Sequence, residues 1–584
     1  MDRKLLPAAI IFVWVLLTGC SSVARNQATP AITSTPIPEQ PYSTMSSQPS
    51  HGLAGGDSIG DAYIPSIGNT GYDVLQYDLD IQFSGSIDAI TATVTVSSVV
   101  TLDDLGRFSL DFTGYQVDSV QAGNQYVPFF RDAGKLYIDL PKALSKGEQL
   151  VTRVAYHGPA IPQDSQFINL GGLGFHVIEG NNLTYAFGEP DGAHAWFPCN
   201  DHPLDKAEYR FSLTVPKGFT AVANGTLLQT TSKDDRQVFN WLAKDPMVTY
   251  LATVVVGKYE RLDKPAVGEV KIRHYVLEGD FNYSDKLNDT RDILEYYSDL
   301  IGPYPFSEFG FIIIRTSDDV AQFAEETQTI VMVDRGYMLS ESAVGVLAHE
   351  LAHHWFGDSV SLANWNEVWL KEGMATYLMV RWLDHQGYVG LQALMADLEN
   401  VLVTNAANLN QPLNQPLPST MYGPNTYDKG AWVYYMLSQQ MGEPAFTTFL
   451  REYYKRFADG NASTVEVQEL AEEVSGLDLS TFFQEWVYGS GNPDLHVSWA
   501  TLPEGVAVQV CQAGGGQVFS VPLEIKLAAA DGTSQQEVIP LDEGQEQVTY
   551  SVPFTVTELQ VDPDQKLLAG TTVSQVDALS ACAP

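Results

Sequence analysis

Hydrophobic and polar residues alternate with a period of two between residues 61 and 260 of the chain. The alternation is clearest over 77–83 and 92–96, and Gly, Asn and Asp residues separate such runs. This period is typical of strands that are buried on one face. The hydrophobic run 251–256 indicates a buried strand at the end of the region. The pattern predicts an N-terminal antiparallel β domain over 61–260.

Between residues 261 and 490 the hydrophobic positions recur with a helical period instead. The pattern predicts helices over 285–300, 341–356, 367–385 and 427–440. Two short hydrophobic runs, 311–315 and 329–333, precede the second of these helices and are expected to be strands. Strands followed by packed helices indicate an α+β domain that is mostly helical.

Alternation returns near the C-terminus, over 506–510, 521–525 and 549–552. These runs predict a small C-terminal β-sandwich over 491–584. Cys511 and Cys582 both lie in this domain, so they are the candidate pair for a disulfide in an oxidising compartment, and the sequence leaves their reduced form open.

The N-terminus has the pattern of an export signal. Arg3 and Lys4 form a short basic region, and 5–17 is an apolar stretch too short to span a bilayer comfortably. The stretch ends in the letters LTGC, which resemble the box cleaved by the bacterial lipoprotein signal peptidase. We expect a lipoprotein signal peptide over 1–20 and lipidation of Cys20. An ordinary secretory signal and an uncleaved anchor are the alternatives.

Residues 21–60 are rich in Ser, Thr, Pro, Gln and Gly and predict a disordered tether. The signal and the tether together predict an exported cell-envelope protein, lipid-anchored to the outer face of a bacterial membrane.

Charge narrows the range of partners. Among 584 residues, 71 are acidic and 32 are basic, so the formal net charge is −39. This field repels nucleic acid and anionic membrane surfaces and favours cationic ligands. An acidic, solvated surface that keeps an exported protein soluble explains the same charge. We therefore expect no nucleic-acid partner, and no pattern indicates an oligomeric state.

The residues that carry chemistry lie in the two central predicted helices. His349 and His353 are four residues apart in the HELAH segment, so a helix presents both imidazoles to one point. Glu372 lies in the next predicted helix and supplies a third ligand for zinc. Two imidazoles and one carboxylate leave a fourth position open for water, as in catalytic zinc sites. Glu350 is one residue off the ligand stripe and is the candidate general base.

The pattern and its context resemble the M1 metallopeptidase family. The spacing HExxH-x18-E is met by His349, Glu350, His353 and Glu372, within the segments AHELAHHWFGDSV and WNEVWLKEGMATY. The resemblance implies a thermolysin-like catalytic domain over 261–490, one Zn²⁺ per chain and aminopeptidase activity.

The resemblance also assigns residues outside the zinc motif. The segment TYDKGA resembles the family segment whose tyrosine hydrogen-bonds the tetrahedral intermediate, so Tyr427 is the candidate for this role and Tyr422 is the alternative.

The family binds the substrate's free amino terminus through a Gly-x-Met-Glu-Asn loop. Here the equivalent segment begins with Phe323 instead of glycine, and it implies Glu326 as the amine-binding carboxylate, with Glu325 as its competitor. Glu189, in the β domain, is the second implied carboxylate.

These assignments predict a zinc-dependent aminopeptidase that hydrolyses the first peptide bond of peptides with a free N-terminus. Two alternatives remain open at this point. One is an endopeptidase, or a hydrolase of a non-peptide substrate, that uses the same zinc site. The other is a surface protein that uses the fold only as a binding module.

Overall fold

The structure, a computed structural model, describes residues 49–582 except 169, 179, 181, 317–321, 405–408 and 514–516. Its residues form two compact units, which are described separately. The first comprises the described residues of Phe12–Trp365 together with Tyr454–Ala462, and the second those of Asn366–Tyr453 and Ser463–Pro584. The predicted signal peptide, with Cys20, and most of the predicted tether lie outside the described residues.

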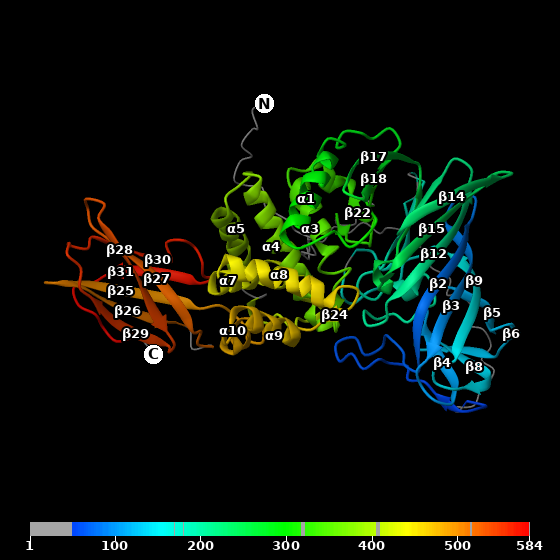
Figure 1. The fold of residues 1–584 in the computed structure, drawn as a ribbon, viewed down its shortest axis with the longest axis horizontal. Helices are drawn as coiled ribbons and strands as arrows, with labels where there is room; N and C mark the ends of the chain where they lie inside the picture. The colour runs from blue at the N-terminus through cyan, green and yellow to red at the C-terminus, as the bar shows by residue number, and fades with distance from the viewer. Residues whose placement is uncertain are drawn as a thin grey trace, which may run out of the picture. The chain divides into compact units, whose positions relative to one another are not determined.

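An eight-stranded sheet is the largest element of the first unit (Figure 1). Its strands, in spatial order, are β14 (Thr226–Lys233), β15 (Arg236–Met247), β12 (Ala207–Pro216), β2 (Tyr72–Phe83), β3 (Ala89–Val100), β9 (Gln149–Pro159), β5 (Gln116–Ala122) and β6 (Gln125–Tyr126). In β2 the alternate residues Tyr77, Leu79 and Ile81 are buried, whereas Asp80 and Gln82 are exposed. The period-two pattern therefore reports a sheet with one buried face, as predicted.

The β domain is not wholly antiparallel, because β2 pairs with β12 in parallel. These two strands are far apart in the sequence, and alternation carries no information about the direction of such a partner. Residues near the end of the predicted tether also differ from expectation. β1 (Leu53–Ala54) pairs in parallel with β4 (Leu105–Asp111), and the N–H of Leu53 donates to the carbonyl of Asp104 at 2.6 Å.

This unit also contains two four-stranded sheets. One has the order β1, β4, β8 (Lys135–Leu144) and β7 (Phe129–Asp132). The other has the order β10 (Gly174–Ile178), β11 (Leu183–Phe187), β16 (Val254–Gly257) and β13 (Thr220–Ala223). The segment that carries Glu189 begins directly after β11, so this second sheet fixes where that segment starts.

A mixed sheet precedes the helix that carries the HELAH segment. Its order is β17 (Tyr259–Val267), β18 (Val270–Leu277), β20 (Phe311–Ile314), β22 (Val331–Asp334) and β21 (Ala324–Glu325), with β19 (Glu308–Phe309) also paired to β18. The associated helices are α1 (Thr290–Leu300), α2 (Arg335–Leu339) and α3 (Ala343–His353). The predicted strands 311–315 and 329–333 are confirmed as β20 and β22. The second begins later than predicted because Ile330 closes a turn onto the carbonyl of Thr327.

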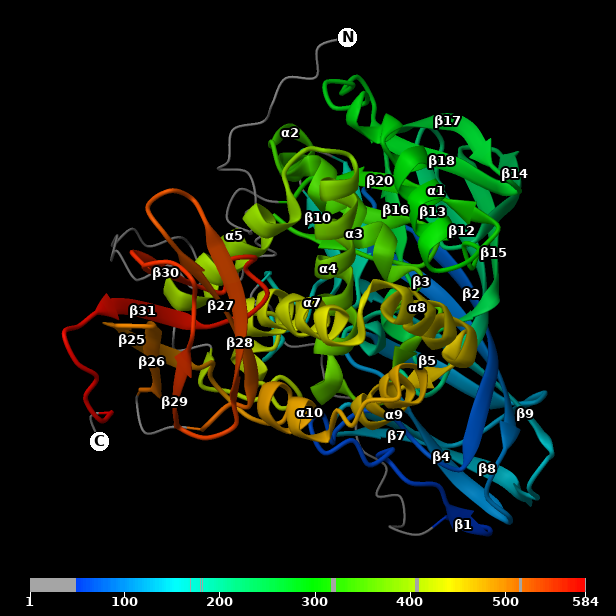
Figure 2. The same cartoon turned by 60° about the vertical axis from the view of Figure 1, so that its left-hand side comes forward.

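Helices form the first part of the second unit. They are α4 (Trp369–His385), α5 (Leu391–Thr404), the π-helical turn η6 (Asn425–Lys429), α7 (Gly430–Met441), α8 (Glu443–Phe457, whose last residues belong to the first unit), α9 (Thr464–Ser475) and α10 (Ser480–Trp486). α7 lies against α4 in Figures 1 and 2. A Cβ added to Gly373 of α4 would lie 2.7 Å from the backbone of Gly430, so glycine permits this close packing.

Two sheets form the C-terminal part of the second unit. One has the order β29 (Gln545–Tyr550), β26 (Gly505–Gln512), β25 (Asp494–Leu502) and β31 (Gly570–Gln575). The other has the order β28 (Ser534–Leu541), β27 (Val521–Ala528) and β30 (Glu558–Val561). The multidomain fold class is thus confirmed: N-terminal β sheets, a helical central region and C-terminal β sheets.

A disulfide joins Cys511 to Cys582, with Cα atoms 5.7 Å apart and a separation of 71 residues in the sequence. Cys199 is a free, buried cysteine, and burial raises the pKa of its thiol well above the ordinary value. A thiol that stays protonated is a poor nucleophile, which agrees with a packing role for Cys199.

Replacing both Cys511 and Cys582 by serine is expected to destabilise the C-terminal sheets by about 2–5 kcal/mol, because the crosslink restricts the unfolded chain. Thermal unfolding with and without a reductant measures the effect. The reductant should lower the Tm of the wild type and leave the variant unchanged. An equal shift in both proteins would contradict the assignment.

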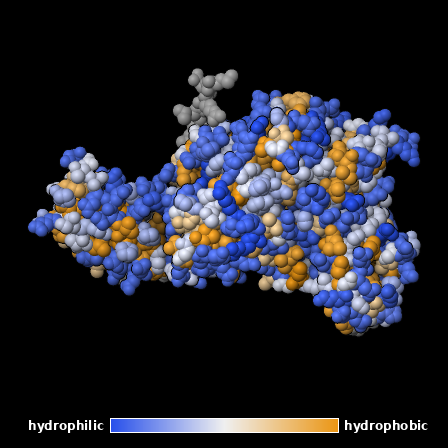
Figure 3. All heavy atoms as spheres, viewed as in Figure 1, coloured by the Kyte–Doolittle hydropathy of each residue, from blue (hydrophilic) through white to orange (hydrophobic). Residues whose placement is uncertain are grey.

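Hydrophilic residues cover most of the face drawn in Figure 3, with hydrophobic residues scattered among them. No helix among the described residues is both long enough and apolar enough to cross a membrane.

Candidate metal centre and active site

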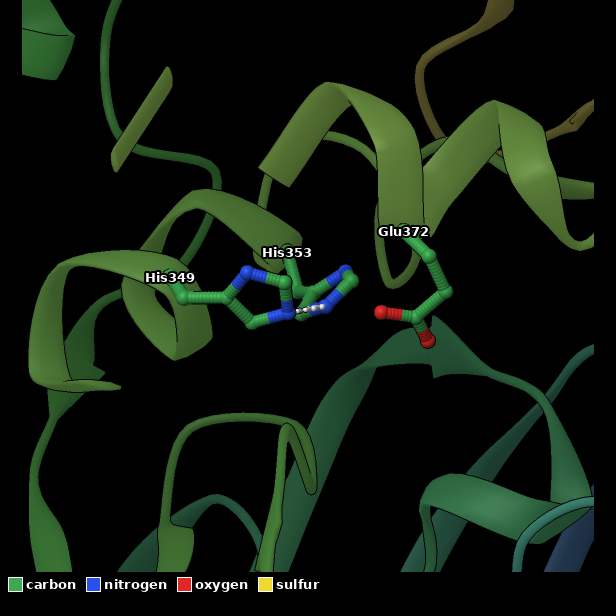
Figure 4. A group of neighbouring side chains, drawn as sticks. All are labelled: His349, His353 and Glu372. Carbon is green, nitrogen blue, oxygen red and sulfur yellow. Dashed lines mark hydrogen bonds between the residues drawn. The ribbon is translucent and has the colours of Figure 1, made fainter. Parts of the chain in front are cut away.

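Helix α3 carries the two histidines of the HELAH segment. His349 and His353 are both buried, and their ring centroids lie 4.7 Å apart. The two Nε2 atoms are 3.0 Å apart, so both imidazoles point to one place, as Figure 4 shows. Nδ1 of His353 lies 3.2 Å from the carbonyl oxygen of Phe356. A hydrogen bond from Nδ1–H to this carbonyl leaves the lone pair of Nε2 for a metal.

Glu372 lies in the first turn of α4. Its side chain is buried within the second unit. Two imidazoles and one carboxylate are a donor set that zinc accepts, and they leave one coordination position open. The three residues predicted as ligands therefore fit a zinc ion.

A second group of side chains lies beside this histidine pair, within the first unit. One ligand atom each of Glu326, Glu350 and His353 lie within 4.8 Å of one another, and all three residues are buried. The predicted general base and the predicted amine-binding carboxylate are therefore close to the same metal ligand.

The adjacent carboxylates Glu325 and Glu326 differ in their partners. Oε1 of Glu325 accepts hydrogen bonds from the backbone N–H groups of Gly188 and Glu189, each at 3.1 Å. Glu326 belongs to the group with Glu350 and His353, and one of its carboxylate oxygens also lies within 4.8 Å of one of Glu189. Of the two candidates in the sequence, Glu326 is thus the one near the metal-ligand side chains.

Phe323, which stands where the family loop has glycine, turns into the protein interior. It is 2% exposed, and its ring centroid lies 4.7 Å from that of Phe187 and 6.1 Å from that of Tyr185. The larger side chain is therefore accommodated by packing against β11.

Tyr427 lies in the π-helical turn η6, directly before α7. The sequence predicted an ordinary helix from residue 427. A π-helical turn holds one extra residue per hydrogen-bonded ring, and hydrophobic periodicity does not reveal such a change. Tyr427 and the alternative Tyr422 are both 7% exposed, so burial does not distinguish between them.

Comparison with known proteins identifies the family. The sequence profile described as "Peptidase M1 N-terminal domain" matches residues 72–251, and that described as "Peptidase family M1 domain" matches residues 285–486. The crystal structure of an M1 zinc metallopeptidase from Deinococcus radiodurans is 30% identical to this chain. The match has a TM-score of 0.68 and covers 75% of this chain and 98% of that one. The chain belongs to peptidase family M1.

Curated relatives of this M1 peptidase are longer. Tricorn protease-interacting factor F2 of Thermoplasma volcanium is 26% identical over 344 residues, which cover 55% of this chain and 42% of the relative. Probable aminopeptidase 1 of Sulfurisphaera tokodaii is 26% identical over 454 residues, which cover 72% of this chain and 54% of the relative. The chain thus spans about half the length of these relatives. A mutant of the Deinococcus enzyme has been solved with a Tyr-Ser-Ala substrate bound.

Sequence reasoning missed a lysine beside Glu372, the third predicted ligand of this M1 peptidase. Nζ of Lys371 lies 2.5 Å from Oε1 of Glu372, and both side chains are buried. A hydrogen-bonded cation holds a ligating carboxylate in one orientation, as outer partners of metal ligands generally do. The residue is directly next to Glu372 in the sequence, but only the fold shows that its ammonium turns back to the carboxylate.

A second unforeseen lysine, Lys429, lies in the turn that carries Tyr427. It is completely buried, and its Nζ has no hydrogen-bond partner among the residues that the structure describes. Burial lowers the pKa of Lys429 to about 7, because an ammonium group is poorly solvated inside the protein.

Replacing Lys429 with methionine is expected to stabilise the M1 peptidase at pH 6. Below pH 7 the folded protein must bury the ammonium, whereas the unfolded chain keeps its lysine protonated up to about pH 10.5. The loss of wild-type stability caused by burying the ammonium is therefore complete below pH 7 and disappears as the pH rises toward 10.5. The stability gained by the methionine variant should shrink over the same interval. The free energies of unfolding of the wild type and the variant at pH 6 and pH 9 measure this difference in stability. An unchanged or lower stability at pH 6 would mean that the ammonium group is compensated.

Proposed function

We propose that this M1 peptidase is a zinc aminopeptidase that hydrolyses the first peptide bond of peptides with a free N-terminus. The observation that carries the proposal is the grouping of Glu326, Glu350 and His353 within 4.8 Å. A carboxylate that binds an α-ammonium so close to the general base and a metal ligand leaves room for one residue between the peptide's N-terminus and the cleaved bond.

Each residue has a separate task in this mechanism. His349, His353 and Glu372 hold the zinc ion, which supplies Lewis-acid polarisation of the scissile carbonyl when bound. Glu350 takes the proton of the attacking water and later delivers it to the leaving amine.

The remaining residues bind the substrate. Tyr427 donates a hydrogen bond to the oxygen on which negative charge develops. Glu326 and Glu189 bind the ammonium group of the substrate and so set the position of cleavage.

A comparison of free and blocked substrates tests the proposal. The purified protein is assayed with leucyl- and alanyl-anilides and with their N-acetylated forms, each with and without a zinc chelator. Only the free-amino substrates should be cleaved, and the chelator should abolish cleavage. Equal cleavage of the acetylated substrates would favour an endopeptidase, and no cleavage of any substrate would favour a binding module.

We also propose that the protein is exported and anchored to the outer face of a bacterial membrane through a lipid on Cys20. The LTGC box supports this location, and so does the disulfide Cys511–Cys582, because such bonds persist in oxidising compartments. Cys20→Ala should release the protein from the membrane fraction and prevent incorporation of labelled fatty acid. Unchanged membrane association and no label in the wild type would contradict the proposal.

A further inference from the structure

Glu325 binds main-chain groups that the neighbouring strand leaves without partners. β11 ends at Phe187, so the N–H groups of Gly188 and Glu189 lie beyond its ladder. Buried main-chain donors need acceptors, and Oε1 of Glu325 accepts from both of them at 3.1 Å. One carboxyl oxygen of Glu325 thus holds the backbone of Gly188 and of Glu189, whose side chain is the second predicted amine-binding carboxylate.

The same segment is closely packed on its other sides. A Cβ added to Gly188 would lie 2.3 Å from the carbonyl oxygen of Tyr250, so only glycine allows this approach. The carbonyl of Gly188 accepts the N–H of Gly192 at 2.7 Å. The rings of Phe187 and Phe323, which flank the two segments, lie 4.7 Å apart. Glu325, in β21, adds direct hydrogen bonds to the backbone of Gly188 and Glu189.

The charge state of Glu325 suits this task. The residue is 1% exposed, and its Oε2 is buried with no hydrogen-bond partner among the described residues. Burial, with the nearby carboxylates of Glu326 and Glu189, raises the pKa of Glu325 well above its usual value. The two backbone N–H groups lower it only in part. A protonated Glu325 holds the backbone without adding a third negative charge beside Glu326 and Glu189.

We propose that Glu325 is a positioning residue for substrate recognition, which holds Gly188 and Glu189 so that the Glu189 carboxylate faces the substrate's ammonium group together with Glu326. The inference rests on the proposed aminopeptidase function. It divides the two adjacent carboxylates by role: Glu326 binds the substrate, and Glu325 binds the main chain next to the second substrate-binding carboxylate.

Two substitutions separate the hydrogen bonds from packing. Glu325→Gln keeps a carbonyl oxygen that accepts from both N–H groups. Its side chain is uncharged, like that of the protonated acid. Glu325→Met keeps the length and removes the acceptor. Hydrogen exchange of the peptide that contains Gly188 and Glu189 should accelerate about tenfold in the methionine variant, because each net hydrogen bond is worth roughly that factor. Exchange in the glutamine variant should stay close to wild type. Unchanged exchange in the methionine variant would overturn the proposal, whether or not the protein is an aminopeptidase.

Kinetics test the second half of the proposal. In the methionine variant, KM for a leucyl-anilide should rise about tenfold with kcat largely retained, and glutamine should restore KM. Glu189→Gln should also raise KM, and the double variant Glu189→Gln/Glu325→Met should be little worse than Glu189→Gln alone, because both act through one carboxylate. Fully additive effects, or a loss confined to kcat, would overturn the positioning role. Equal zinc content in all variants, measured directly, shows that the metal is not the cause. A wild type without aminopeptidase activity would instead refute the proposed function. Hydrogen exchange would then still test whether Glu325 holds the backbone of Gly188 and Glu189.

Discussion

Glu350→Gln is expected to lower kcat by about 10²–10⁴-fold, which is the usual contribution of a general acid–base residue. The substitution keeps the shape of a completely buried side chain, so the packing of α3 should not change. The carboxamide cannot accept the proton of the attacking water, and no later proton is available for the leaving amine. KM should change little, because Glu350 contacts the reacting groups rather than the substrate's amino terminus.

Metal content decides how this result is interpreted. The glutamine variant should retain zinc at the wild-type ratio, since Glu350 is not among the three predicted ligands. His353→Ala should lose both zinc and activity. Glu341→Gln, an exposed acid two residues before α3, is the matched control and should behave as wild type. If Glu350→Gln kept more than a tenth of the wild-type rate, a different group would have to be the base.

The zinc motif was readable from the sequence because its geometry is local. Residues i and i+4 of any helix lie on one face, so His349 and His353 needed only a helix to meet, and α3 supplies it. Glu372 was predicted from its spacing and from the family resemblance, because the i and i+4 rule applies only within one helix. The alternation in β2 likewise gave the buried face of the sheet but not its parallel partner β12.

Two further features depended on contacts between distant segments. The sequence does not indicate which of the adjacent carboxylates Glu325 and Glu326 lies near His353. That choice depends on the segment after β11, more than 130 residues earlier in the chain. Strands β17 and β18 were missed because they lie in a region where helical periodicity dominates.

Glu326→Gln is expected to raise KM for free-amino substrates by roughly 30- to 1,000-fold, which corresponds to about 2–4 kcal/mol for one partner of a buried charge pair. The substrate's ammonium group keeps its charge but loses a carboxylate that is itself 3% exposed. An uncompensated cation in a buried site is costly, so binding rather than turnover should carry most of the loss. Zinc content should remain at the wild-type level.

Blocked substrates make this expectation specific to the amino terminus. N-acetylated anilides carry no ammonium group, so Glu326→Gln should not weaken their binding, measured as inhibition of leucyl-anilide cleavage. Glu341→Gln again serves as the control for a lost surface charge. An unchanged KM for leucyl-anilide would remove Glu326 from amine recognition. Because Glu325 is occupied by main-chain N–H groups, Glu189 would then be the remaining predicted carboxylate for that task.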